Sequence, residues 1–197
     1  MRMTVSFAAM TAACGLLSAC GGASAGGNAN APTPADAAGG GGDALVGGWT
    51  EADACKTLDQ GVVAAVAGQA VTKAETKMNH QADGDDPVSR SQCHYLLADG
   101  RTVILSTRVE MPVDNTDGPA KFEAQEKSMN MVPEAVAGVG RGAYWTPGDM
   151  PHLDFWLGKH QTAFFQFKGD ASTITLKKGD EAWAKDLAIK LSHKIGG

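Results

Sequence analysis

Positive charge is scarce in this chain of 197 residues. It carries 17 lysine and arginine residues against 22 acidic ones, which gives a net charge of −5 and a sequence pI near 5.5. Domains that bind nucleic acids usually present a basic patch or stripe, so this charge balance argues against a nucleic-acid partner.

Common catalytic signatures are also missing. The chain beyond its glycine-rich segment contains no Gly-x-Ser-x-Gly, no His-Glu-x-x-His and no Ser-x-x-Lys motif. These patterns are typical of serine hydrolases, zinc peptidases and β-lactamases. The sequence therefore predicts a non-enzymatic protein with no catalytic residue, no cofactor and no metal site.

Residues 1–19 have the pattern of a secretory signal peptide. Arg2 precedes an uncharged, largely apolar stretch from Val5 to Leu17, which corresponds to a basic n-region followed by an apolar h-region. This stretch is shorter than the roughly 20 residues that a helix needs to cross a bilayer. We therefore expect the segment to direct export and to be removed.

The end of this leader, Leu17-Ser18-Ala19-Cys20, resembles the bacterial lipobox. The resemblance implies that Cys20 carries acyl chains such as palmitate and becomes the first residue of the mature protein. Each buried methylene contributes about 0.8 kcal/mol, so several chains would hold the protein at the bilayer. Gly21 stands where some lipoproteins carry an aspartate that retains them in the inner membrane. The resemblance thus implies the outer membrane, facing the periplasm, in a Gram-negative cell.

Residues 20–48 are expected to form the lipidated cysteine and a disordered tether. Ten of the 28 residues from Gly21 to Gly48 are glycine and eight more are alanine. Such a segment buries too little apolar surface to offset the entropy of ordering it. We place a single folded domain at residues 49–197, and a chain of about 150 residues can bury a core.

Strands that occur in clusters between helices predict an α+β domain with antiparallel pairing. Apolar residues at helical spacing and capping residues predict three helices, near 53–68, 117–131 and 180–195. Alternating or β-rich segments predict strands at 71–77, 91–98, 101–110, 142–146, 152–157, 160–168 and 174–176. Asp99-Gly100 predicts a type I′ turn that joins the strands at 91–98 and 101–110 into a hairpin. The order of elements also permits a loose duplication, with each half containing one helix and three strands.

Two cysteines, Cys55 and Cys93, are left for the domain once the leader is removed and Cys20 is acylated. An even pair in an oxidising compartment predicts a structural disulfide. Closing a loop of about 39 residues would stabilise the fold by about 4 kcal/mol. The alternative is a redox or metal pair, but the chain has neither Cys-x-x-Cys nor four cysteine or histidine ligands at zinc-site spacing.

One strand carries a candidate polar site. His152 and Asp154 share a face of the expected strand at 152–157, and we expect His160 to lie across the hairpin from them. Three such side chains could hold a metal ion. Alternation in an antiparallel sheet also predicts a plain solvated face at these positions.

Short matches spread over residues 53–195 give the domain a resemblance to known proteins. They are Asp53-Ala54-Cys55, Cys93-His94-Tyr95, Gly138-Val139-Gly140, Ala143-Tyr144-Trp145 and the amphipathic helix near the end. These motifs resemble small bacterial lipoprotein domains of unknown function, including an actinobacterial type. The resemblance implies a paired Cys55 and Cys93 and no established activity.

These features together predict a membrane-anchored lipoprotein of the cell envelope with a non-enzymatic binding domain. The expected partners are the lipid bilayer, through acylated Cys20, and an envelope protein or small ligand that the sequence does not identify. The alternative hypothesis is a periplasmic metal-binding protein or a hydrolytic enzyme that uses His152, Asp154 and His160.

Overall fold

A computed structural model describes residues 53–110, 116–170, 175–177 and 179–196. The described residues all belong to one compact unit of the chain, Gly42–Gly197. The predicted signal peptide, the predicted acylation site Cys20 and the predicted tether lie outside the described residues. The last expected strand, at 174–176, was wrong as far as it is described, because residues 175 and 176 do not belong to a strand. No helix in the described ranges is long and apolar enough to cross a bilayer.

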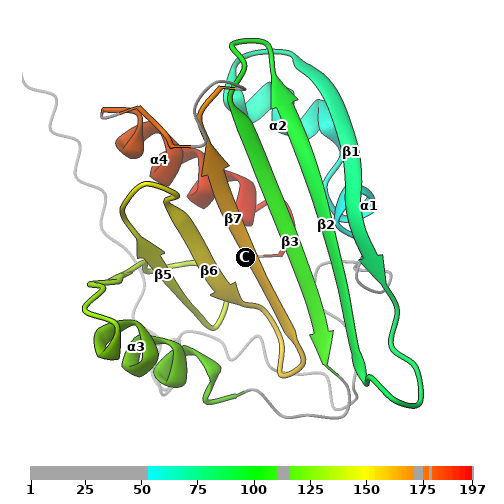
Figure 1. Ribbon diagram of the computed structural model, residues 1–197, viewed down its shortest axis with the longest axis vertical. Coiled ribbons are helices and arrows are strands. Elements are labelled where there is room, and N and C mark those ends of the chain that lie inside the picture. The colour runs from blue at the N-terminus through cyan, green and yellow to red at the C-terminus, as the bar shows by residue number, and fades with distance from the viewer. Residues whose placement is uncertain (1–52, 111–115, 171–174, 178, 197) are drawn as a thin grey trace, which may run out of the picture. The chain divides into compact units, whose positions relative to one another are not determined.

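Eleven helices and strands make up the described part of the domain (Figure 1). In chain order they are α1 (Ala54–Thr57), α2 (Gln60–Ala67), β1 (Val71–His80), β2 (Val88–Leu97), β3 (Thr102–Glu110), α3 (Gly118–Ser128), β4 (Glu134–Ala135), β5 (Gly142–Thr146), β6 (His152–Trp156), β7 (Gln161–Lys168) and α4 (Glu181–Ser192).

The strands form one seven-stranded antiparallel sheet in the order β1-β2-β3-β7-β6-β5-β4. The α+β class with antiparallel pairing is therefore confirmed. The link between the two halves is the pairing of β3 with β7, in which Val103 lies opposite Phe167 and Leu105 opposite Phe165. The loose duplication is not supported. Among the described residues, two helices and three strands of nine or ten residues precede α3, whereas four shorter strands and one helix follow it.

The described residues contain four helices, so the prediction of three was wrong. The expected first helix is broken at Leu58, whose backbone is extended (φ −133°, ψ 109°). Two aspartates explain the break, since each caps its own helix: Asp53 Oδ1 accepts from Lys56 N, and Asp59 Oδ1 accepts from Gly61 N. The turn between them also places the Leu58 side chain in the core, where it is 2% exposed.

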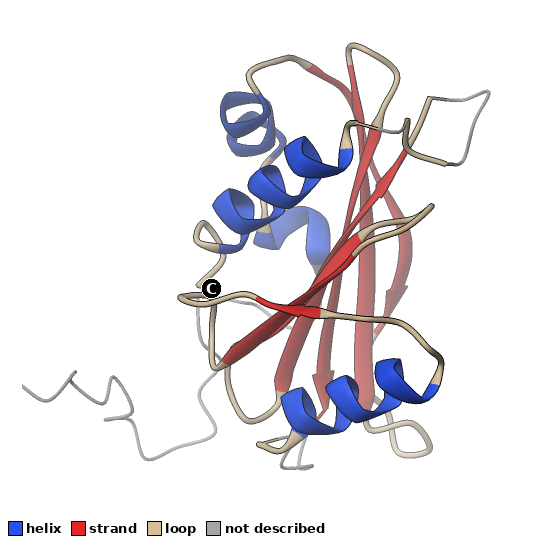
Figure 2. Cartoon of the chain, turned by 90° about the vertical axis from the view of Figure 1, so that its left-hand side faces the viewer, coloured by secondary structure: helices blue, strands red, loops and turns tan. Residues whose placement is uncertain are grey.

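Helices α1, α2 and α4 cover one face of the sheet and enclose the core (Figures 1 and 2). Alternation sends Tyr95, Leu105, Phe155 and Phe165 to this face, and none of them has exposed surface. Helix α3 lies on the opposite face, at the end nearest β5 and β6. We call this second face the open face, because α3 covers only part of it.

Helix α1 is attached to β2 by a covalent bond and a buried hydrogen bond. The sulfurs of Cys55 and Cys93 are bonded at 1.98 Å, with their Cα atoms 5.1 Å apart, so the structure contains the predicted disulfide. The hydroxyl of fully buried Tyr95 donates to the Leu58 carbonyl oxygen at 2.6 Å. Together these contacts fix the first described residues of the domain against β2, the second strand of the sheet.

The hairpin between β2 and β3 forms as expected, but its turn is of another type. Leu97 N donates to Arg101 O, and Gly100 N donates to Leu97 O at 3.0 Å. Gly100 has φ +88°, whereas Asp99 does not have positive φ. A type I′ turn requires positive φ at both central residues, so the connection is a three-residue loop that ends in a left-handed glycine.

The edge strand β1 pairs irregularly with β2. The register shifts between Val71 and Lys73 and again between Thr76 and Met78. Most of the strand is exposed, and Lys73 and Lys77 both form ion pairs with Glu75, at 2.7 and 2.8 Å. The other edge of the sheet is the two-residue strand β4.

Candidate ligand-binding cleft

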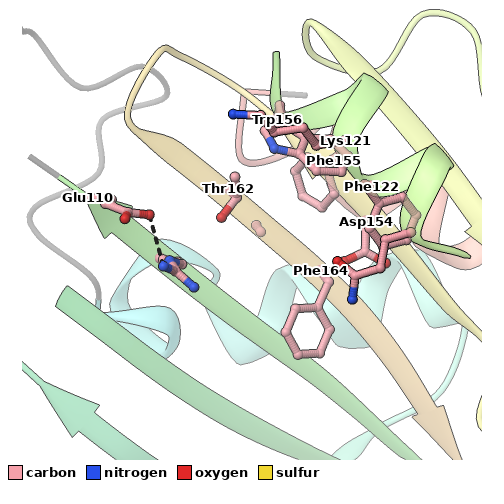
Figure 3. A pocket seen from close by; sticks show the side chains of 12 residues that line it. Glu110, Lys121, Phe122, Asp154, Phe155, Trp156, Thr162 and Phe164 are labelled. Carbon is pink, nitrogen blue, oxygen red and sulfur yellow. Dashed lines mark hydrogen bonds and ion pairs between the residues drawn. The ribbon is translucent and has the colours of Figure 1, made fainter. Parts of the chain in front are cut away.

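A cleft of about 300 Å³ lies between α3 and the open face of the sheet (Figure 3). Four elements supply the side chains that define its chemistry. They are Arg108 and Glu110 from β3, Lys121 and Phe122 from α3, Asp154 and Trp156 from β6, and Thr162 and Phe164 from β7.

The period-two alternation of β6 and β7 explains why polar side chains reach this cleft. Leu153 and Phe155 point into the core and have no exposed surface, as the sequence predicts. The residues between and after them, Asp154 and Trp156, therefore face the other way and line the cleft.

An aromatic cluster joins α3 to the sheet and forms one wall of the cleft. The Phe122 ring centroid lies 5.5 Å from that of Trp156 and 5.8 Å from that of Tyr144. The Tyr144 hydroxyl donates to Glu123 Oε2 at 3.0 Å. The contact of Phe122 with Trp156 is edge-to-face, and contacts of that kind contribute about 0.5–1.5 kcal/mol beyond the area that they bury. The cluster therefore packs α3 against β5 and β6.

The basic side chains of the cleft already have acidic partners. Arg108 Nη2 lies 2.9 Å from Glu110 Oε2, and Lys121 Nζ lies 2.8 Å from Asp117 Oδ2, one helical turn earlier. Both cations are at least half exposed, and surface pairs of this kind contribute little to stability.

Asp154 is the charged residue of the cleft that lacks a full partner. Its Oδ2 atom is buried and has no hydrogen-bond partner among the described residues. The side chain that forms an ion-pair contact with this oxygen is His152, whose Nε2 lies 3.4 Å away. Burial raises the pKa of the Asp154 carboxyl to about 7; the charge of His152 lowers it, and that of Glu126 raises it.

His152 is oriented by its other ring nitrogen. Its Nδ1 lies 3.1 Å from the Met150 carbonyl oxygen, which can only accept, so Nδ1 carries the proton. In the neutral ring Nε2 is then an acceptor facing Asp154 Oδ2.

Glu126 on α3 adds a second buried carboxyl close to Asp154. The residue is 6% exposed, and within the described ranges its Oε2 atom has no hydrogen-bond partner. Sequence reasoning missed Glu126, although its spacing gave a signal. It lies four residues after Phe122 and eight after Gly118, so all three share the helix face that packs on the sheet.

His160 does not join His152 and Asp154, and the expectation that it lies across the hairpin from them was wrong. In the register of β6 and β7, His152 lies opposite Gln166 and Asp154 opposite Phe164. His160 lies in the connection before β7, where its carbonyl oxygen accepts from Glu110 N at 2.9 Å. His160 belongs to the connection that joins β6 to β7, beyond the last paired residues, Trp156 and Thr162. Nowhere in the described chain do three His, Cys, Asp or Glu side chains come together as a metal site.

No protein-family model, curated protein or solved structure matches this chain.

Proposed function

We propose that this chain is a lipid-anchored protein of the bacterial cell envelope whose α+β domain binds a small ligand without transforming it. The anchor is acylated Cys20, the segment between Cys20 and residue 48 is a tether, and the ligand site is the cleft under α3. In a Gram-negative cell we place the anchor in the outer membrane, with the domain facing the periplasm.

The observation that supports ligand binding is the Asp154 carboxyl of the cleft, whose Oδ2 atom accepts no hydrogen bond from the described residues. Buried polar atoms are almost always hydrogen-bonded, and leaving one without a partner costs about 1–3 kcal/mol. Asp154 lines a cleft with aromatic walls, and its buried Oδ2 atom has no hydrogen-bond partner as far as the chain is described. Small-molecule sites combine such walls with a few polar groups of this kind.

The support for the anchor comes from the lipobox resemblance of Leu17-Ser18-Ala19-Cys20. Acylation needs the cysteine thiol, so Cys20→Ser should release the protein from membranes or leave it unprocessed. Membrane fractionation and the mass of the mature protein measure this outcome. Cys14→Ser, which changes a cysteine within the leader, is the control and should fractionate as the wild type does. A Cys20→Ser protein with wild-type fractionation and mass would contradict the proposed anchor.

Filling the cleft tests ligand binding. Thr162 lines the cleft from β7, so Thr162→Trp should occupy its volume. We expect soluble fragments that receive saturation transfer in NMR from the wild-type full chain to lose it with this variant. Thr102→Trp makes the same substitution on the open face, outside the residues that line the cleft, and should leave the transfer unchanged. If no fragment in a diverse library depends on Thr162 in this way, the cleft is not a ligand site.

A further inference from the structure

We infer that the cleft recognises the protonated amine of a small organic molecule, with Asp154 pairing the ammonium group and the aromatic wall packing against its apolar part. This inference rests on the proposed function, because it names the class of ligand that the same cleft takes.

The charge balance of the cleft points to a cation. Arg108 and Lys121 each have an acidic partner within 3 Å, so neither presents an unmet charge to an anionic ligand. Asp154 has only the 3.4 Å contact with His152, and its Oδ2 accepts no hydrogen bond from the described chain. An ammonium group carries three donors and a positive charge, and it would supply what this carboxyl lacks.

The aromatic side chains strengthen the preference for a cation. Phe122 and Trp156 line the cleft together with Asp154, and Figure 3 shows Phe122 beside Asp154, away from the ion pair of Glu110. Aromatic rings attract cations within about 6 Å of the ring centroid, and tryptophan does so most strongly. A carboxylate beside aromatic rings therefore favours an organic ammonium over a neutral or anionic group.

The volume limits the size of the ligand. A cleft of about 300 Å³ is at the small end of the range for ligand sites, about 300–1,000 Å³. An amine with one ring or a short alkyl chain fits this volume, whereas a folded peptide or a polymer does not. The site also differs from a metal site, since in the described ranges no three ligating side chains converge.

The test compares three probes that share a phenethyl group and differ in the charge of the polar group at its end. They are phenethylamine, 2-phenylethanol and 3-phenylpropionate, titrated into the full chain at about pH 8, where the Asp154 carboxyl is ionised. We expect the amine to bind at least about tenfold more tightly than the alcohol, and the carboxylate most weakly, as a charge-assisted hydrogen bond predicts. Isothermal calorimetry gives the three dissociation constants.

Two variants localise the effect. Asp154→Asn keeps the shape of the side chain and removes its charge, so it should weaken amine binding about tenfold and leave the alcohol unchanged. Asp149→Asn removes an exposed carboxyl outside the cleft and should change neither constant. Because the three probes are also compared within the wild type, the test does not depend on how well either variant folds.

The outcomes separate this inference from the proposed function. If the alcohol or carboxylate binds as tightly as the amine and Thr162→Trp abolishes that binding, the cleft is a ligand site but the amine class is wrong. If amine binding survives Asp154→Asn unchanged, the assignment to Asp154 is wrong. Failure of all three probes overturns the inference alone, whereas failure of the broader fragment library as well overturns the proposed function.

Discussion

Replacing both Cys55 and Cys93 with alanine is expected to lower the free energy of unfolding by about 4 kcal/mol. The disulfide joins residues 38 positions apart and ties α1 to β2. Without it the unfolded chain gains the entropy of an open loop, while the folded chain keeps the Tyr95 hydrogen bond to Leu58 O. Urea unfolding of the oxidised wild type and the double variant, followed by circular dichroism, measures the difference.

Reduction of the wild type is the control for this experiment. Cys93 has no exposed surface, so alanine also leaves a small cavity and the variant mixes two effects. Reduced wild-type protein lacks the crosslink but keeps both sulfur atoms, and it should lose most of the same stability. If mass spectrometry shows two free thiols and the unfolding midpoint does not move, the crosslink does not stabilise the fold.

The Asp154 carboxyl should make the fold less stable as the pH rises from about 4 to about 7. Its pKa is raised from 3.8 to about 7 because the group is buried, so the folded protein holds a proton that the unfolded chain has lost. The stabilisation that comes from this proton is complete below the unfolded pKa and disappears as the pH passes through the folded one. About three pH units at about 1.4 kcal/mol each set an upper limit near 4 kcal/mol.

Asp154→Asn removes this pH dependence. As the pH is raised from 4 to 8, we expect the free energy of unfolding of the variant to rise by about 2–4 kcal/mol relative to that of the wild type. The charge of His152 offsets part of the effect, because it lowers the pKa of the Asp154 carboxyl. Asp149→Asn, at an exposed turn position, should follow the wild type at every pH. Parallel pH profiles for Asp154→Asn and wild type would show that burial does not penalise the Asp154 charge.

The elements that depend on local sequence were the most predictable. Alternating residues predict β6 and β7 correctly, because period two follows from the geometry of a single strand. The turn at Gly100 was assigned to the wrong type, since Asp-Gly fits both a two-residue turn and a three-residue loop. The first helix was predicted as continuous because Leu58 fits a helical apolar stripe, and the break is visible only in the extended backbone of Leu58.

The cleft depends on contacts between distant segments, and for that reason the sequence did not predict it. His152 and Asp154 were recognised as one polar face, but Glu126 lies 28 residues before Asp154. Its carboxyl comes near Asp154 only because Phe122 holds α3 against Tyr144 and Trp156. The pairing of β3 with β7 is likewise a long-range contact that periodicity does not encode.

The irregular pairing of β1 affects whether two copies of this chain can join through the edges of their sheets. A regular edge strand offers a row of free backbone groups on which a neighbouring molecule can add its own strand. Two register shifts within β1 interrupt that row, and Lys73 and Lys77 place positive charge along it. Many copies held at one surface would therefore meet edge to edge without growing into a shared sheet.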